Sequence, residues 1–184
     1  MADDYLARDE RVGIRWIVAS DLDQLTRFAF TVSIAEPLTD RRRLGEVFAA
    51  TALSTQSAAA VAIVEMATGR LIGTSQCYRA APCIHGFELG YVLHKPSDRG
   101  KGFAGPAVRM FSDFLFRNHA DLFRQQLLIE TWNTASWMLA ERIGFTREGL
   151  LRSSGLRAAD PGDSLVYSRT RRDWNEELHT KVGG

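Results

Sequence analysis

The spacing of apolar residues along the chain predicts short strands alternating with helices. Residues 12–18 alternate loosely between apolar and polar side chains, which is typical of a strand with one buried face. Residues 59–66 form a compact apolar run with β-branched side chains, and residues 71–78 resume that pattern after a turn at 67–70. The second and third of these segments therefore predict a β-hairpin.

Two early stretches have the spacing of helices. At the first, Ser20 and Asp21 offer side-chain oxygens that can accept hydrogen bonds from the first N–H groups of a helix. The second begins with the triplet Arg41-Arg42-Arg43 and runs to about residue 53. The three arginines are expected on a solvated helix face, with contact to an anion as the alternative.

The clearest helix begins at Phe103. Its apolar residues recur at steps of three and four: Phe103, Ala107, Met110, Phe111, Phe114 and Leu115. Pro106 is tolerated because it lies in the first turn, where its missing N–H would have no intrahelical partner. A shorter helix over residues 135–142 is expected to stop at Gly144, which can adopt a left-handed conformation.

Four further apolar segments complete the predicted strands, at residues 87–93, 126–131, 145–151 and 164–171. The resulting order is β, α, α, β, β, β, α, β, α, β, β. This order indicates an α/β (mixed α+β) fold, with a mixed sheet and helices on both of its faces. Two polar ends flank it: residues 1–10, expected to be a flexible N-terminus, and residues 175–184, expected to be a polar tail.

Composition narrows the class of protein. The chain has 184 residues, which fits one domain, and its 23 basic side chains nearly balance 22 acidic ones. A nucleic-acid binder would show a basic excess, so nucleic acid is not expected as a partner. No apolar run approaches the length of a membrane span, and the acidic N-terminus has no apolar signal core. A cytoplasmic protein is expected, with Cys77 and Cys83 as reduced thiols.

The segment from Asp98 to Gly105 carries the most chemical information. Its glycines and Ala104 leave a run of backbone N–H groups without bulky side chains, and the run leads directly into the helix predicted from Phe103. Converging N–H donors at the positive end of a helix dipole are typical of an anion site. Arg99 and Lys101 add cations at its rim.

Four interpretations of this loop can be compared. Gly100, Gly102 and Gly105 match the dinucleotide pattern G-x-G-x-x-G, but residues 94–99 separate the preceding strand from the first glycine, which that pattern does not allow. A phosphate-binding Walker loop fails because glycine follows Lys101. A plain structural turn remains open. The fourth interpretation is the R/Q-x-x-G-x-G/A loop of acyl-coenzyme A binding, because Arg99, Gly102 and Ala104 occupy its positions in register.

Other segments match the proteins that share this acyl-CoA loop, in the expected order: Glu88–Leu93, Asn133–Ser136, Ile143–Phe145 with Glu148–Gly149, Ser164–Ser168 and Arg172–Trp174. With these residues the sequence resembles the GNAT acetyltransferase superfamily, and in particular the branch that includes the ribosomal-protein N-terminal alanine acetyltransferases. The resemblance implies an acyl-CoA N-acyltransferase domain over residues 11–174. It implies a single-domain fold with a twisted, mixed and mostly antiparallel sheet, splayed between its fourth and fifth strands.

The resemblance also implies where acetyl-CoA, the acyl donor, would bind. The pantetheine arm would lie in the splay, paired with the main chain of Tyr91, Val92 and Leu93 and hydrogen-bonded by Asn133. The pyrophosphate would bind to Arg99, Gly100, Lys101, Gly102, Phe103 and Ala104. No metal is expected, because His85, His94, His119 and His179 show no metal-binding spacing.

Acetyl transfer needs a neutral amine and a proton for the departing thiolate. Glu88 is the candidate base, with a structural or substrate-orienting acid as the alternative. Ser136 is the candidate donor to the sulfur, with a simple helix residue as the alternative. Ala140 occupies the position where many family members have a tyrosine, and Tyr167 is expected in the core with its hydroxyl satisfied. A cysteine intermediate is not expected, because neither cysteine has a recognisable basic partner.

The sequence leaves open the roles of several side chains and the identity of the acetyl acceptor. Trp132, Trp137 and Met138 are expected to pack in the core, with an aromatic wall for the acceptor as the alternative, and His94 is expected at the surface. The first hypothesis for the function is acetylation of a small primary amine by direct attack in a ternary complex. The second is acetylation of a protein N-terminus, and the third is an acyl-CoA-binding regulatory module without turnover. A homodimer is possible, and no membrane is expected as a partner.

Overall fold

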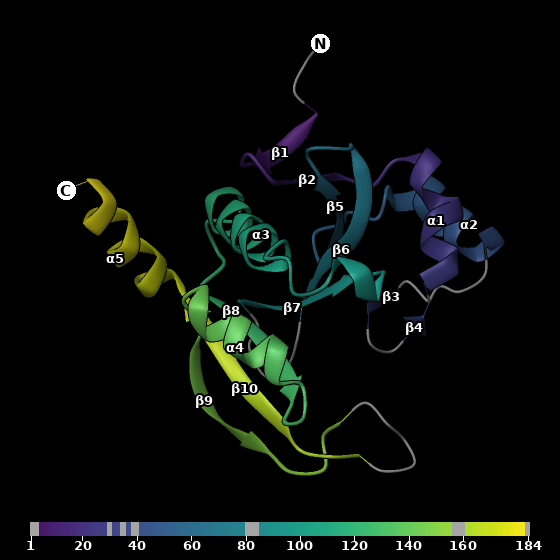
Figure 1. The fold of residues 1–184 in the computed structure, drawn as a ribbon. Coiled ribbons are helices and arrows are strands. Elements are labelled where there is room, and N and C mark those ends of the chain that lie inside the picture. The colour runs from purple at the N-terminus through teal and green to yellow at the C-terminus, as the bar shows by residue number, and fades with distance from the viewer. Residues whose placement is uncertain are drawn as a thin grey trace. The chain divides into compact units, whose positions relative to one another are not determined.

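The computed structural model describes residues 4–28, 31–33, 36–37, 41–79, 85–155 and 161–182. Its strands are β1 (Tyr5–Arg8), β2 (Val12–Trp16), β3 (Thr31–Ser33), β4 (Glu36–Pro37), β5 (Ala58–Glu65), β6 (Arg70–Arg79), β7 (Gly86–Leu93), β8 (Arg124–Glu130), β9 (Thr146–Leu151) and β10 (Ser164–Thr170) (Figure 1). Its α-helices are α1 (Leu22–Leu25), α2 (Arg41–Thr51), α3 (Ala104–Asn118), α4 (Thr134–Arg142) and α5 (Arg171–Val182), and short 3-10 turns lie at Ala19–Asp21, Thr26–Phe28 and Pro96–Asp98.

Eight strands follow the hydrogen-bonded order β1-β2-β5-β6-β7-β8-β10-β9, and β3 and β4 form a separate pair. The pairing of β7 with β8 is parallel, whereas those of β1 with β2, β2 with β5, β5 with β6, and β10 with both β8 and β9 are antiparallel. This open mixed sheet with its helices confirms the predicted α/β class. Among the described residues, no helix combines the length and the apolar character that crossing a membrane requires.

The chain divides into two compact units, which are described one at a time. Unit 1 comprises Met1–Tyr78 and Gly90–Phe111, and unit 2 comprises Arg79–Leu89 and Ser112–Gly184. Strand β7 therefore begins in unit 2 and ends in unit 1, and helix α3 begins in unit 1 and ends in unit 2.

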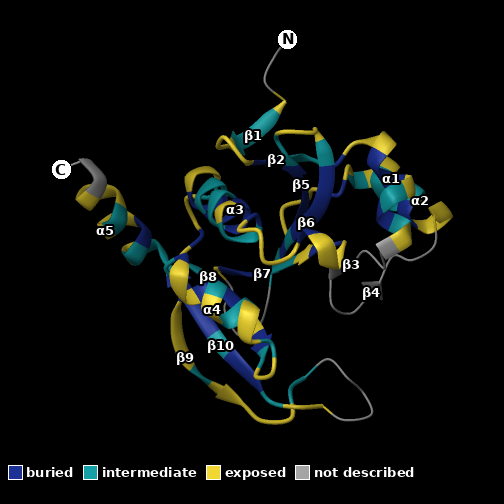
Figure 2. Ribbon diagram, in the orientation of Figure 1, coloured by how far each residue is buried: buried dark blue, intermediate teal, exposed yellow. Residues whose placement is uncertain are grey.

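The core of unit 1 lies around β5. This strand is buried along six consecutive positions, so that both of its faces are covered, as Figure 2 shows by its dark blue colour. Side chains of α1 and α2 pack with β5 and β6 in one cluster: Ile17, Leu22, Leu25, Leu44, Leu53, Ala60, Ala62, Val64 and Leu71. The hairpin predicted from these two strands is confirmed.

The first residues of the described chain form a strand where a frayed end was expected. Residues 5–8 make β1, which pairs antiparallel with β2. A Cβ atom added to Gly13 would come within 2.6 Å of the Tyr5 ring, so the glycine allows the tyrosine to lie against β2. In the turn between the strands, the carboxylate of Asp9 accepts hydrogen bonds from the backbone N–H groups of Arg11 (2.7 Å) and Val12 (2.8 Å).

Unit 2 ends in a helix where a polar tail was expected. Thr170 and Asp173 cap α5 reciprocally: the Asp173 carboxylate accepts from the Thr170 backbone N–H (2.8 Å), and the Thr170 hydroxyl accepts from the Asp173 N–H (3.3 Å). Trp174 stacks on Phe116 of α3, with the ring centres 5.7 Å apart. These contacts explain why residues as polar as 175–182 are helical.

Two arginines connect β10 and the start of α5 to α3 within unit 2. The fully buried Arg169 donates hydrogen bonds to Ser112 (2.6 Å) and to the carboxylates of Asp113 (2.8 Å) and Glu177 (2.6 Å). The guanidinium of Arg171 donates to three carbonyl groups at and just after the end of α3, those of Phe116, His119 and Leu122. A cation in this position also interacts favourably with the negative end of the helix dipole.

Glu148 on β9 forms an ion pair that strongly lowers the pKa of its carboxylate. Both of its oxygens accept from the guanidinium of Arg124 (2.7 and 2.6 Å), and the Ser168 hydroxyl adds a third hydrogen bond (2.6 Å). These bonds, led by those of Arg124, lower the pKa of Glu148 from 4.5 to about 2.

We expect Glu148→Gln to lower the midpoint of thermal unfolding at pH 7 by about 1–3 °C, because a partly exposed ion pair contributes no more than about 1 kcal/mol. A folded-state pKa below the unfolded one gives stability that is present above pH 4.5 and is lost as the pH falls toward about 2. Unfolding curves from pH 7 to pH 2 should therefore converge for the two proteins. Glu46→Gln, which breaks an exposed pair with Arg42, is the control and should change the midpoint less. A constant difference at every pH would contradict the prediction.

Candidate functional site

The loop between β7 and α3 has the backbone that the sequence predicts. A 3-10 turn at Pro96–Asp98 is closed by hydrogen bonds from the Asp98 N–H to the Lys95 carbonyl and from the Arg99 N–H to the Pro96 carbonyl (both 3.0 Å). Gly100 and Gly102 follow with φ angles of +73° and +79°. Both lie in the left-handed region that favours glycine, so the glycines are needed by the shape of the loop itself.

Helix α3 begins at Ala104, directly after this loop. The first N–H groups of a helix have no acceptor within the helix, and the positive end of the helix dipole lies at the same place. Phe103 is buried and fixes the chain where the helix starts. Exposed Arg99 precedes the two glycines, and exposed Lys101 lies between them. This combination of bare N–H donors, dipole and cations suits a multiply charged anion.

An ion pair between a buried aspartate and a partly exposed arginine fixes the first residues of the loop. Asp98 is only 2% exposed, and both of its oxygens accept from the guanidinium of Arg70 on β6 (2.9 and 2.8 Å). The hydrogen bonds from Arg70 lower the pKa of Asp98. Arg70 also reaches Glu65 at the end of β5 (3.2 Å). The β5–β6 hairpin therefore fixes the turn from which the glycines start.

His94 is buried, which corrects the expectation of a surface histidine. Its backbone N–H donates to the Ile72 carbonyl (2.9 Å), which extends the contact of β7 with β6. Burial lowers the pKa of the ring to about 4, so the imidazole is neutral at neutral pH. Next to it, the Arg99 guanidinium donates to the Leu93 carbonyl (3.3 Å) and so folds back toward the end of β7.

Arg11 is a contact of the loop that the sequence did not indicate. It lies just before β2, and its guanidinium donates a hydrogen bond to the Lys101 carbonyl. The same guanidinium lies over the Phe103 ring, 5.4 Å from the ring centre. The two residues that Arg11 contacts stand on either side of Gly102.

Glu88, the candidate base, is a buried carboxylate near the start of β7. It is opposite Gln126 in the parallel pairing of β7 with β8, and Nε2 of Gln126 donates to its Oε2 (2.9 Å). The sequence did not identify Gln126 as this partner. Within the same strand, Glu88 comes before the predicted pantetheine-binding residues Tyr91, Val92 and Leu93, of which Val92 is exposed and Leu93 is buried.

Asn133 and Ser136 lie together at the start of α4. Asn133 is the N-cap of this helix, and its side-chain oxygen accepts from the Ser136 backbone N–H (3.3 Å). The NH2 group of the same carboxamide is the part that can donate to a ligand. Asn133, Ser136 and Glu88 all belong to unit 2, whereas the glycine loop and residues 91–93 belong to unit 1.

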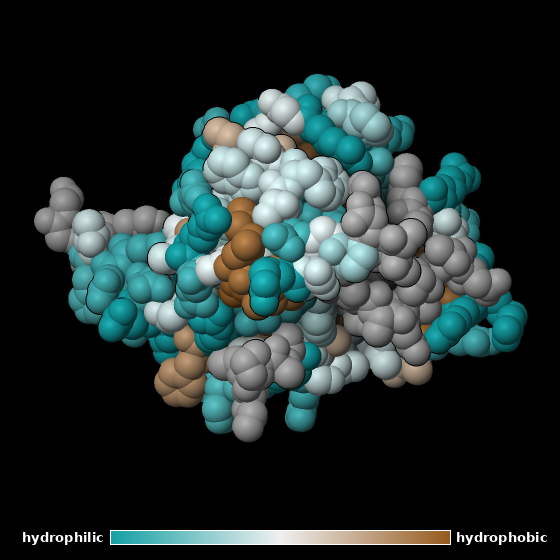
Figure 3. All heavy atoms as spheres, turned by 90° about the horizontal axis from the view of Figure 1, so that it is seen from below, coloured by the Kyte–Doolittle hydropathy of each residue, from teal (hydrophilic) through white to brown (hydrophobic). Residues whose placement is uncertain are grey.

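The apolar side chains beside this turn are more exposed than core packing would require. Trp132 is 61% exposed and Met138 is 46% exposed, whereas Trp137 is partly buried. The expectation that they pack in the core is therefore wrong for Trp132 and Met138. On the face drawn in Figure 3, apolar side chains form small separate groups among hydrophilic ones.

Tyr167 is fully buried, and its hydroxyl donates to Glu141 (2.9 Å), which confirms the expected core tyrosine. Burial, together with this hydrogen bond, raises its pKa to about 12. Cys77 is buried in β6, and Cys83 lies outside the described residues. The described part of the chain contains no group of three or more His, Cys, Asp and Glu side chains that could hold a metal ion.

The loop and helix α3 lie within a domain pattern known from other proteins. The sequence pattern of the acetyltransferase (GNAT) domain matches residues 11–146. The uncharacterized N-acetyltransferase p20 of Bacillus licheniformis is 33% identical over 87 residues, which are 47% of this chain and 48% of that protein. The chain thus spans about half the length of the curated relatives that it matches.

Solved structures show the same fold. A mutant of the spermidine N-acetyltransferase SpeG from Vibrio cholerae has a TM-score of 0.75 at 18% identity, covering 90% of this chain and 97% of that one. The ribosomal-protein-S5-alanine acetyltransferase from Vibrio fischeri has a TM-score of 0.70 at 19% identity, covering 91% and 97%. The family pattern spans most of this chain and includes the whole glycine loop, so the chain belongs to the GNAT acetyltransferase family.

Proposed function

We propose that this protein transfers the acetyl group of acetyl-CoA to a primary amine of a small molecule, by direct attack in a ternary complex. The observation that carries the proposal is the loop Arg99–Ala104, in which two glycines have positive φ angles, two cations alternate with them, and α3 begins directly afterwards. The pyrophosphate of coenzyme A is an anion of the kind that this arrangement suits. Membership of the GNAT family supports this choice over a plain structural turn or a dinucleotide site.

The donor would extend from this loop along the last part of β7. Main-chain groups of Tyr91, Val92 and Leu93 would pair with the pantetheine amides as a neighbouring strand would. The carboxamide of Asn133 would donate from its NH2 group, because its oxygen already caps α4. Coenzyme A would thus be held by backbone groups, by the cations Arg99 and Lys101, and by one oriented amide.

Each chemical step then has a candidate group. The amine nitrogen attacks the thioester carbonyl, the C–S bond breaks, and the thiolate leaves. Glu88 would accept the proton that the amine loses, directly or through water, and Gln126 fixes the direction of its carboxylate. Ser136 would donate its hydroxyl proton to the sulfur and recover one from the solvent. Tyr167 is unsuited to that role, because it is buried and donates to Glu141.

Release of free thiol from acetyl-CoA, measured with a panel of amines, tests this proposal. The panel should include polyamines, amino acids, aminoglycosides and peptides that begin with alanine or serine. Rapid release with a small amine supports the proposal, and release with the peptides alone would replace it with N-terminal acetylation of a protein. Tight binding of acetyl-CoA with no release for any amine would replace it with a regulatory binding module.

A further inference from the structure

We propose that Arg11 is a positioning residue, which orients the peptide group between Lys101 and Gly102 so that the Gly102 N–H can donate to the pyrophosphate of coenzyme A. The inference rests on the proposed function, because it assigns a role within the same site. It also assigns a function to the hairpin of β1 and β2, which precedes the loop by 90 residues in the sequence.

The hydrogen bond from Arg11 fixes the direction of the peptide group between Lys101 and Gly102. In a trans peptide, the C=O and N–H bonds point in opposite directions. The Arg11 guanidinium holds the Lys101 oxygen on its own side of the loop. The N–H of Gly102 must therefore point away from Arg11. A β-carbon added to Gly102 would lie 3.3 Å from Nη1 of Arg11, which shows that the guanidinium covers one side of this glycine. The amide donor faces the other side.

Arg11 also restricts the flexibility of the loop around Gly102. Glycine adopts both positive and negative φ angles easily, so a loop with two glycines has several conformations of similar energy. Arg11 contacts the residues on both sides of Gly102, through the Lys101 carbonyl and the Phe103 ring. Two contacts from one planar group select a single arrangement of the intervening peptide. A preformed donor does not lose that conformational entropy when the ligand binds.

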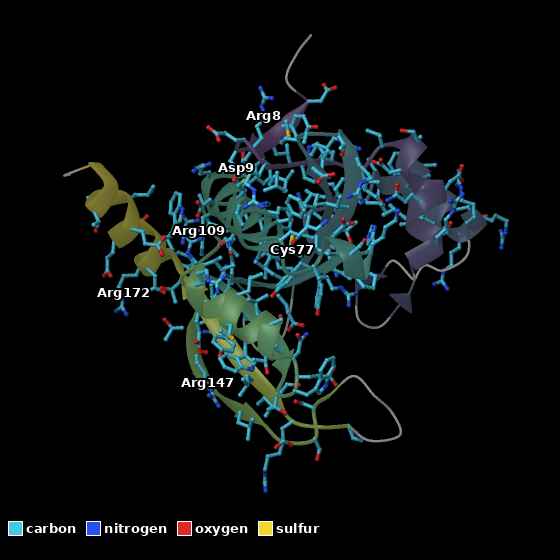
Figure 4. All side chains as sticks on the ribbon, viewed as in Figure 1. Arg8, Asp9, Cys77, Arg109, Arg147 and Arg172 are labelled. Atoms are coloured by element: carbon cyan, nitrogen blue, oxygen red, sulfur yellow. The ribbon has the colours of Figure 1, made fainter. Side chains whose placement is uncertain are left out.

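Backbone hydrogen bonds hold Arg11 itself in place. Its N–H donates to the Asp9 carboxylate (2.7 Å), and its carbonyl accepts from the Met66 N–H (3.0 Å). The backbone of Arg11 is therefore held from two directions before any ligand is present. Asp9 lies in the turn after β1, beside Arg8 at the end of that strand (Figure 4). The turn thus presents the guanidinium to the loop.

Arg11→Met tests the inference, because it keeps the length of the side chain and removes its donors. We expect kcat/KM for acetyl-CoA to fall about tenfold, since a hydrogen bond from a charged group is lost. We expect kcat at saturating acetyl-CoA to change less than twofold. Acetyl-pantetheine lacks the pyrophosphate, so its kcat/KM should be unaffected by the substitution. This contrast distinguishes orientation of the phosphate loop from a general loss of structure, which would lower the rate with both donors.

Two further variants complete the experiment. Arg8→Met removes the same charge from the same hairpin and should leave the preference for acetyl-CoA over acetyl-pantetheine unchanged. Arg11→Lys keeps one donor and should recover part of that preference, which also covers the case in which Arg11→Met does not fold. Equal preferences in Arg11→Met and in the parent protein would overturn the inference. If the parent itself did not bind coenzyme A, the proposed function would fail instead.

Discussion

Substitution of Gly102 by valine should raise the dissociation constant of acetyl-CoA at least 100-fold. At φ +79°, a β-branched residue is strained by on the order of 1–3 kcal/mol, so the loop would leave its present conformation. The added methyl groups would also crowd the N–H of the same residue. Two hydrogen bonds to a charged ligand, at about 1.5–3 kcal/mol each, account for a loss of this size. Isothermal titration calorimetry with coenzyme A measures it.

Gly69→Val is the matched control for this substitution. Gly69 has a φ angle of +68° and lies in the β5–β6 turn of the same unit, where an added Cβ would meet no atom within 4 Å. Its replacement imposes similar backbone strain without touching the loop. We therefore expect a lower unfolding temperature and a normal affinity for coenzyme A. If Gly102→Val bound coenzyme A within threefold of the parent, the assignment of the loop would be wrong.

Substitution of Glu88 by glutamine should lower kcat by about 10²–10⁴ while leaving the affinity for acetyl-CoA unchanged, because a general base contributes a factor of that order. Glutamine has the same shape and keeps an oxygen that can accept from Gln126. The packing around residue 88 should therefore survive. Stopped-flow or steady-state thiol release, together with calorimetric titration of coenzyme A, separates the two quantities.

A second glutamate serves as the control for this change. Glu130→Gln makes the same chemical change at the end of β8 and should leave turnover within twofold. Turnover of Glu88→Gln within threefold of the parent would remove Glu88 from the role of base.

Strong local periodicity explains which parts of the fold could be predicted. The hairpin of β5 and β6 and the long helix α3 have clear apolar patterns, and the structure has both. β1 and α5 were missed because their stability comes from contacts outside their own sequence. β1 depends on pairing with β2 and on Tyr5 against Gly13, and the polar helix α5 depends on its cap and on Trp174.

In the candidate site, too, some residues could be predicted from the sequence and others could not. The glycine loop and the start of α3 could be predicted, because local backbone geometry requires those residue types. The partners that hold the site could not be predicted. Arg11 reaches Lys101, Arg70 reaches Asp98, and Gln126 reaches Glu88 across 90, 28 and 38 positions of sequence. No local pattern records such pairs, and for the same reason the burial of His94 and the exposure of Trp132 were assigned wrongly.

The contacts of Arg171 with the end of α3 have a consequence for the order of synthesis. Every segment of unit 1 precedes residue 112, so those segments have all left the ribosome long before translation ends. The carbonyl groups of Phe116, His119 and Leu122 cannot accept these hydrogen bonds until Arg171 has been synthesised, about fifty residues later. A nascent chain that stalls before β10 would therefore carry a frayed helix end and exposed apolar strands. We expect proteases to remove such chains quickly.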